Sequence, residues 1–136
     1  MRVVADTNIY ISALNFGGAA EELLALGRHG IIDIYISAPI LEEIGGVLAR
    51  KFQWSRAREK AAVSAIKNFA VVVEPRERIS VLRDDPDNRI LECGVAAGAD
   101  VIVSGDMDIR RVGEFRGIAI ESPRTFLDKK AWEKTT

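Results

Sequence analysis

The chain contains one cysteine, Cys93, and no long hydrophobic run. A lone cysteine cannot form an internal disulfide and has no second cysteine with which to build a zinc site, so we expect Cys93 to be a small buried helix residue. No apolar stretch approaches the roughly 20 residues of a membrane-spanning helix, and the first residues lack the layout of a signal peptide. We therefore expect a cytoplasmic protein without a membrane contact.

The chain also lacks a surplus of basic residues, since its net charge is -1 and its pI is about 5.9. This balance argues against a protein that holds nucleic acid by its own overall charge. It does not exclude a nuclease, because a bound metal supplies local positive charge and basic residues can gather on one face. A length of 136 residues with 48% hydrophobic and 29% charged residues indicates one globular domain, residues 1–136.

Short β-branched runs alternate along the chain with stretches of helical periodicity. We expect strands at 2–5, 31–36, 71–73, 101–103 and 118–120, and helices at 8–14, 19–28, after Ser37, at 55–69, after a loop at 84–88, and from Ser122. This alternation predicts an α/β protein with three α/β/α layers and a central parallel sheet. Residues 132–136 are expected to fray.

Acidic residues occur where such a sheet presents its functional groups. Asp6 follows the first expected strand, and Asp106 follows the strand at 101–103. Asp87 and Glu43 lie near the starts of two expected helices. The carboxyl ends of parallel strands meet at one rim, so the four acids can converge there.

Helix capping is a competing explanation for some of these acids. At Asp87, a cap and a functional carboxylate are equally supported by the pattern. For Asp108 the pattern favours a cap of a short helix at 109–112. By periodicity alone Glu43 is a solvated helix residue, and its neighbour Glu42 competes for any role at the rim.

Four carboxylates in one place require a counter-charge, because like charges a few ångströms apart raise one another's pKa values. A site made only of oxygen ligands suits Mg²⁺ or Mn²⁺. A divalent ion of this kind promotes hydrolysis of a phosphodiester by activating water and offsetting charge on the phosphoryl oxygens. The sequence therefore indicates a metal-dependent hydrolase.

Four segments resemble the PIN-domain family and, within it, the VapC-like toxins of type II toxin-antitoxin systems. The segments cover nearly the whole chain in the family's order. They read VVADTNIYISAL, SAPILEEIGGVL, DPDNRILECGVAAGADVIVSGDMDI and IESPRTFL. Two positions depart from the family pattern, namely Asn88, where many relatives have Asp, and Gly94, where Ala is usual.

The resemblance implies a PIN-like fold and an Mg²⁺- or Mn²⁺-dependent endoribonuclease, the toxin of a pair, with an RNA substrate, a cognate antitoxin protein and a homodimeric state. It implies that the catalytic residues are also the metal ligands, namely Asp6, Glu43, Asp87 and Asp106. Glu43 is preferred over Glu42 because it occupies the acid-plus-aliphatic position with Ile44. Supporting roles are implied for Thr7, Asn8, Ser104 and Asp108.

Three other functions fit parts of this pattern. An aspartyl-nucleophile phosphatase would have a second Asp at the position of Asn8, and a phospho-accepting receiver domain would need a phosphoacceptor Asp on a central strand and a Lys on a later one. The third alternative is a catalytically weak PIN-fold module that binds RNA or a protein partner. Metal-dependent RNA cleavage that is lost with Asp6 would distinguish the enzyme from this module.

A group of basic residues surrounds one expected helix junction. Its members are Arg50, Lys51, Arg56, Arg58 and Lys60. Such residues can follow a phosphate backbone, but exposed helix faces normally carry solvated charges of this kind, and solvated charge is the favoured interpretation.

Overall fold

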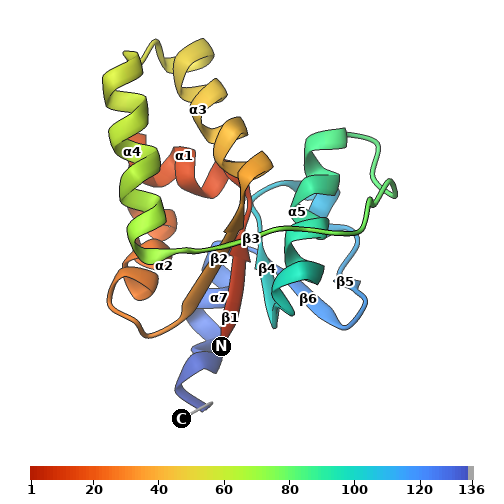
Figure 1. The fold of residues 1–136 in the computed structure, drawn as a ribbon. Coiled ribbons are helices and arrows are strands. Elements are labelled where there is room, and N and C mark those ends of the chain that lie inside the picture. The colour runs from red at the N-terminus through yellow and green to blue at the C-terminus, as the bar shows by residue number, and fades with distance from the viewer. Residues whose placement is uncertain (135–136) are drawn as a thin grey trace.

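The computed structural model describes residues 1–134 (Figure 1). One sheet has the strand order β3-β2-β1-β4-β6-β5, and every neighbouring pair is parallel except β5 with β6. The strands are β1 (Arg2–Ala5), β2 (Asp33–Ser37), β3 (Val71–Val73), β4 (Val101–Val103), β5 (Glu114–Phe115) and β6 (Ile118–Glu121). The predicted α/β fold with a mostly parallel central sheet is thus confirmed.

Helices flank the sheet, and two of them extend from one end of it (Figure 1). They are α1 (Thr7–Asn15), α2 (Gly18–Arg28), α3 (Ala38–Phe52), α4 (Arg56–Phe69), α5 (Asp85–Ala97), α6 (Met107–Arg110) and α7 (Pro123–Lys129), with a 3₁₀ helix at Ala131–Lys134. The pair α3 and α4 forms an arm that rises on one side, with α5 opposite (Figure 1). None of the helices in residues 1–134 is both long enough and apolar enough to cross a membrane.

The centre of the sheet is buried on both faces. Val3, Val4 and Ala5 of β1 are fully buried, and β1 pairs with β2 on one side and β4 on the other. Apolar residues at every position are typical of a strand covered by helices on both faces. This rigid centre fixes the direction in which the chain leaves β1 and β4.

Gly94 has a packing role that the sequence did not reveal. It lies on the face of α5 that meets β4, where an added Cβ would lie 2.8 Å from the Cδ1 atom of Ile102. Ile102 is itself fully buried. The glycine therefore lets α5 approach the sheet more closely than alanine would, which offsets its low helix propensity.

Two predicted boundaries near the acids are wrong. Helix α5 begins at Asp85, inside the expected loop at 84–88, because Pro86 is tolerated in the first helical turn, where its missing N–H is not needed. Asp108 is not the cap of a helix at 109–112. Asp106 is the cap of α6, which begins two residues earlier than expected.

The sequence also missed structure near the C-terminus. Strand β5 is only two residues long and pairs with β6 through a tight turn at Arg116 and Gly117, both of which have positive φ, as in the turns that suit twisted hairpins. The expected fraying from residue 132 is wrong for Trp132, whose ring lies 5.1 Å from that of Phe126. Residues 135–136 of that expectation lie outside the described residues.

Candidate active site

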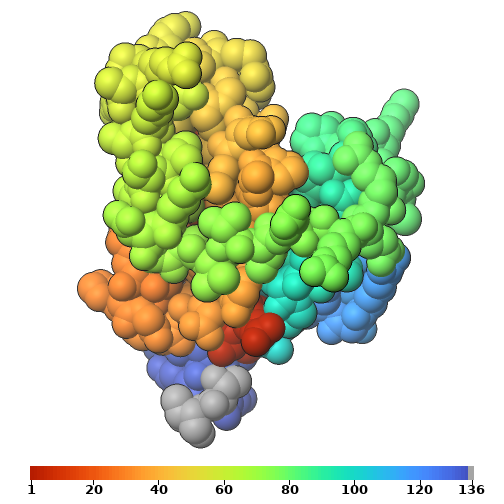
Figure 2. Space-filling view, viewed as in Figure 1, coloured from red at the N-terminus to blue at the C-terminus, as the bar shows by residue number. Residues whose placement is uncertain are grey.

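The four acids singled out in the sequence line one cavity of about 270 Å³ at the carboxyl end of the sheet. It lies where α3 and α5 face each other, and the surface is notched between these two helices (Figure 2). The acids come from the end of β1, the start of α3, the first turn of α5 and the end of β4. They are Asp6, Glu43, Asp87 and Asp106, and the cavity is also lined by Thr7, Asn8 and Asp84.

Asp6 is held in place by two hydrogen bonds. It is only 3% exposed and caps α1, since its Oδ1 accepts from the backbone N–H of Ile9 at 3.0 Å. The hydroxyl of Ser104 donates to its Oδ2. Ser104 Oγ also accepts the backbone N–H of Asp106 at 2.9 Å. One buried serine therefore links the two acids that follow β1 and β4.

The other residues expected to support the acids, Thr7, Asn8 and Asp108, do not bind them through hydrogen bonds of their own side chains in residues 1–134. Within residues 1–134 the side chains of Thr7 and Asn8 line the cavity without a hydrogen bond to an acid. Asp108 is exposed, does not line the cavity and pairs with Arg111 at 3.2 Å. Its charge still reaches Asp87, whose pKa it helps to raise.

Asp106 combines a structural contact with an available oxygen. Its Oδ1 accepts the backbone N–H of Asp108 at 2.8 Å and, at 3.4 Å, that of Ile109. Within residues 1–134, its Oδ2 has no hydrogen-bond partner. Capping therefore fixes the carboxylate in position and leaves one oxygen for a ligand.

The two neighbouring glutamates of α3 are separated by the helix geometry. Glu43 is half-buried and lines the cavity, whereas Glu42 is exposed and does not. Ile40 and Ile44 beside Glu43 are buried in the core. The register of α3 thus turns Glu43 toward the other acids and Glu42 toward solvent.

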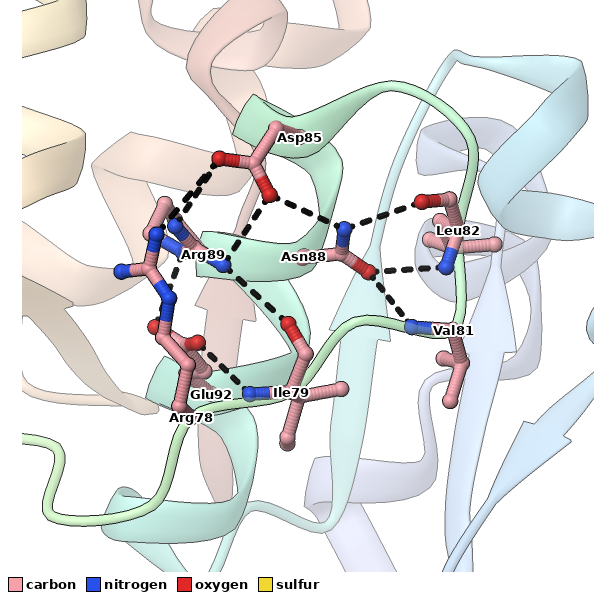
Figure 3. Close-up of polar contacts among 8 residues, drawn as sticks. All are labelled: Arg78, Ile79, Val81, Leu82, Asp85, Asn88, Arg89 and Glu92. Atoms are coloured by element: carbon pink, nitrogen blue, oxygen red, sulfur yellow. Dashed lines mark hydrogen bonds and ion pairs between the residues drawn. The ribbon is translucent and has the colours of Figure 1, made fainter.

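Asn88 holds residues 81 and 82, which lead into the site, by hydrogen bonds. Its Oδ1 accepts the backbone N–H groups of Val81 and Leu82 at 3.1 and 2.8 Å (Figure 3). Its Nδ2 donates to the Leu82 carbonyl at 3.0 Å and to Asp85 at 3.3 Å. An asparagine suits this pattern, because its amide supplies two N–H donors and a carbonyl acceptor, whereas an ionised aspartate can only accept.

Two further charged residues of α5, Arg89 and Glu92, complete the attachment. Glu92 is buried and accepts the backbone N–H of Ile79 at 2.8 Å, while Arg89 donates to the Ile79 carbonyl at 3.1 Å (Figure 3). Arg89 also pairs with Glu92 at 2.9 Å and with Asp85 at 3.2 Å. Residues 79–84 are therefore tied to α5, and this fixes the approach to Asp84 and Asp87.

Replacing Asn88 by Asp is expected to lower the free energy of unfolding by about 1–3 kcal/mol. The carboxylate would leave the Leu82 carbonyl without its donor and would place a like charge beside Asp85, at a site that is 2% exposed. Urea denaturation measures this loss. Asn68→Asp, a change at an exposed position of α4, is the matched control and should change stability little. Equal stability of the two variants would contradict the role given to Asn88.

Burial and mutual repulsion disfavour the charged form of two acids. Burial, followed by the charge of Asp106, raises the pKa of Asp6 from 3.8 to about 6, although the Ser104 hydrogen bond lowers it. Burial and the charges of Asp106 and Asp84 raise the pKa of Asp87 to about 7. The sequence missed Asp84, because the interpretation of 84–88 as a loop gave no reason to place it on the cavity wall.

The donor chemistry of this cavity fits a hard divalent cation. Five carboxylate side chains line it, and burial together with mutual repulsion raises the pKa values of two of them, Asp6 and Asp87. The side chains are nevertheless spread around the cavity. In residues 1–134 no group of three or more Asp, Glu, His or Cys side chains is arranged to hold a metal ion.

Comparison with known families decides the assignment. The sequence profile of the PIN domain family matches residues 2–108, most of the chain. The chain belongs to the PIN domain family. This confirms the resemblance found in the sequence. PIN domains are generally nucleases and typically use divalent metal ions.

Two relatives extend this comparison. An uncharacterized protein of Methanocaldococcus jannaschii is 32% identical over 114 residues, which cover 80% of this chain and 73% of the relative. Among solved structures, VapBC2 from Rickettsia felis, bound to a DNA fragment from its promoter, contains a chain that superimposes with a TM-score of 0.64. That match has 16% identity and covers 90% of this PIN domain and 98% of the other chain, so it shows a shared fold.

Proposed function

We propose that this PIN domain is an Mg²⁺- or Mn²⁺-dependent endoribonuclease that hydrolyses RNA phosphodiester bonds. The observation that supports this most is the single cavity lined by Asp6, Glu43, Asp87 and Asp106, in which Asp6 and Asp87 have raised pKa values. Carboxylates crowded in this way, without a neutralising partner, favour binding of a cation and then of an anionic phosphate.

The same four acids would hold the ion. When bound, the ion supplies positive charge to the phosphate and lowers the pKa of water, so that hydrolysis needs no histidine or lysine. The rest of the protein holds the acids in position. Ser104 fixes Asp6 and the backbone of Asp106, while Asn88 and Arg89 fix the segment that leads to Asp87. Glu43 and Asp87, on facing helices, would turn inward to complete the ligand set.

Metal removal tests this proposal on purified protein. EDTA should stop cleavage of total cellular RNA, and excess Mn²⁺ or Mg²⁺ should restore it. Zn²⁺ should be a poor substitute, because the cavity offers oxygen ligands but no thiolate or imidazole. Gel electrophoresis of the RNA over time measures the effect. Asp106→Asn protein purified in parallel shows how much cleavage comes from contaminating nucleases.

The second candidate function is a module that binds RNA or a protein but turns over slowly. It is favoured by the absence, within residues 1–134, of a preformed group of three metal-ligating side chains. The same experiment separates the two functions. Cleavage that persists in excess chelator, or that is equal in wild-type and Asp106→Asn protein, would exclude the metal-dependent enzyme.

We further propose that the protein is the toxin of a toxin-antitoxin pair and forms a homodimer. The support is the fold that it shares with the VapBC2 chain and the sequence resemblance to VapC-like toxins. Light scattering of the purified protein should give twice the chain mass of 14.9 kDa. The cognate antitoxin should suppress cleavage when the two proteins are expressed together.

A further inference from the structure

The acidic cavity has one basic residue in its wall, Lys51, beside five carboxylate side chains. Lys51 is an exposed residue in the last turn of α3. Within residues 1–134 its ammonium makes no hydrogen bond and no ion pair. The sequence favoured a solvated charge here, but Lys51 lies on the wall of the acidic cavity, where an anion bound in the cavity would meet it.

The position of Lys51 relative to the acids follows from the geometry of α3. The cavity is lined by three residues of α3 at intervals of four, namely Glu43, Val47 and Lys51. Side chains at this spacing form a ridge along one side of a helix. At 1.5 Å per residue, Lys51 lies about 12 Å along the axis from Glu43. Within residues 1–134 no ion pair joins Lys51 to Glu43 or to another acid.

We propose that Lys51 binds a phosphate of the RNA strand next to the one that is cleaved. This inference rests on the proposed ribonuclease function. A strand whose reacting phosphate lies at the acids and which continues along α3 would pass Lys51. An ammonium group binds a phosphate as a point charge, and the contact would offset the repulsion between the strand and the five carboxylates.

The other basic residues of the helix junction are placed differently. Arg50 does not line the cavity, and its guanidinium lies over Gly46, one turn earlier on α3. The guanidinium of Arg58 is stacked 3.7 Å above the ring of Trp54. Of the five basic residues at this junction, Lys51 alone lines the cavity that holds the acids.

A basic residue on the other side of Glu43 is already engaged. Arg89 lines a smaller neighbouring cavity of about 130 Å³ that also includes Glu43. Its guanidinium pairs with Asp85 and Glu92 and donates to the Ile79 carbonyl. Arg89 is therefore used to hold the chain, and Lys51 is the better candidate for a contact with the substrate.

Steady-state kinetics of Lys51→Gln test the proposal on a short single-stranded RNA that contains one cleavage site of the wild-type protein. KM should rise about tenfold, the size expected for a lost charge-assisted hydrogen bond, while kcat should stay close to the wild-type value. The contact is to a phosphate that does not react, so it stabilises the bound substrate and the transition state equally. Arg50→Gln and Lys60→Gln each remove one positive charge outside the cavity and should leave KM within about twofold.

Neutral methylphosphonate linkages, introduced one at a time into the same RNA, locate the contact. One linkage, not the cleaved one, should raise KM for the wild-type protein and leave it unchanged for Lys51→Gln. If Lys51 only offsets the charge of the acids, Lys51→Gln would instead tighten binding of Mn²⁺ without RNA and leave KM unchanged. That result, or a change in KM equal to that of the two controls, would overturn the proposal.

Failure of the proposed function would look different. Wild-type protein would then show no Mn²⁺-dependent cleavage of any RNA. That result would overturn both the proposed function and the Lys51 contact. If wild-type protein cleaves RNA and Lys51→Gln has an unchanged KM, only the proposed Lys51 contact is overturned.

Discussion

Replacing Asp6 by Asn should reduce Mn²⁺-dependent RNA cleavage by at least about a hundredfold while the protein stays folded. Losing an outer-shell partner of a metal site typically costs 10- to 100-fold, and a direct ligand is expected to cost more. Asp6 lies at the end of the central strand and is buried among the other acids. We therefore expect its charge to serve the proposed metal site and not the stability of the fold.

The local hydrogen bonds can accommodate the amide. The Oδ1 of an asparagine would still accept the backbone N–H of Ile9, and its Nδ2 would face the Ser104 hydroxyl, which can rotate to accept. The fold near β1 should therefore be retained, as judged by circular dichroism.

The same variant should be more stable than wild-type protein at pH 8 without metal, by up to about 3 kcal/mol. The pKa of Asp6 is higher in the folded protein, about 6, than its ordinary value of 3.8. Ionisation thus destabilises the folded state, and wild-type stability should fall as pH rises from about 4 to about 6. The pKa of Asp87, raised to about 7, acts in the same direction but less strongly, because Asp87 is partly exposed.

Urea denaturation in EDTA at several pH values measures this difference. The advantage of Asp6→Asn should disappear below about pH 4, where the wild-type side chain is protonated in both states. A variant that unfolds more readily than wild-type protein at pH 8 would show that Asp6 mainly stabilises the fold. Full nuclease activity in the variant would remove Asp6 from the set of ligands.

Glu43→Gln should reduce cleavage by about a hundredfold, whereas Glu42→Gln should change it by less than about twofold. The two residues are chemically identical neighbours, so the difference tests geometry alone. Adjacent helical residues point about 100° apart, and only Glu43 lines the cavity. Glu42 is exposed and contributes one more solvated charge.

Single-turnover rates on one RNA at saturating Mn²⁺ give the comparison, with folding checked by circular dichroism. Glu42→Gln is the matched control, because it removes the same charge one residue away. Equal losses in the two variants would indicate a general charge effect. A larger loss for Glu42→Gln would mean that α3 has another register in the active protein.

The sequence predicted the position of two acids, because that position follows from the sheet. Asp6 comes directly after β1 and Asp106 three residues after β4, and these parallel neighbours bring their carboxyl ends to the same rim. Periodicity alone did not choose between Glu42 and Glu43, and the choice came from the family resemblance. In the structure Glu43 is half-buried and lines the cavity, whereas Glu42 is exposed.

What the sequence missed depends on hydrogen bonds and on helix register within short segments, which sequence patterns do not fix. Asp84 lines the cavity because Asn88 holds residues 81 and 82 by hydrogen bonds. No pattern in the sequence predicts these hydrogen bonds. Lys51 lies two helical turns beyond Glu43, so its place on the same ridge depended on the exact register of α3. The sequence pattern favoured Asp108 as a helix cap, whereas in the structure Asp106 caps α6. Both acids suit a helix start, so the pattern was a weak guide.

The most direct test of the central claim is to express wild-type protein and Asp6→Asn in the same cells and map the 5′ ends of all RNAs. The metal-dependent endoribonuclease proposed here predicts new internal 5′ ends at defined positions in the wild-type sample. These ends should be absent from the Asp6→Asn sample at equal protein levels. The same set of 5′ ends in both samples, or no new ends in either, would contradict the claim.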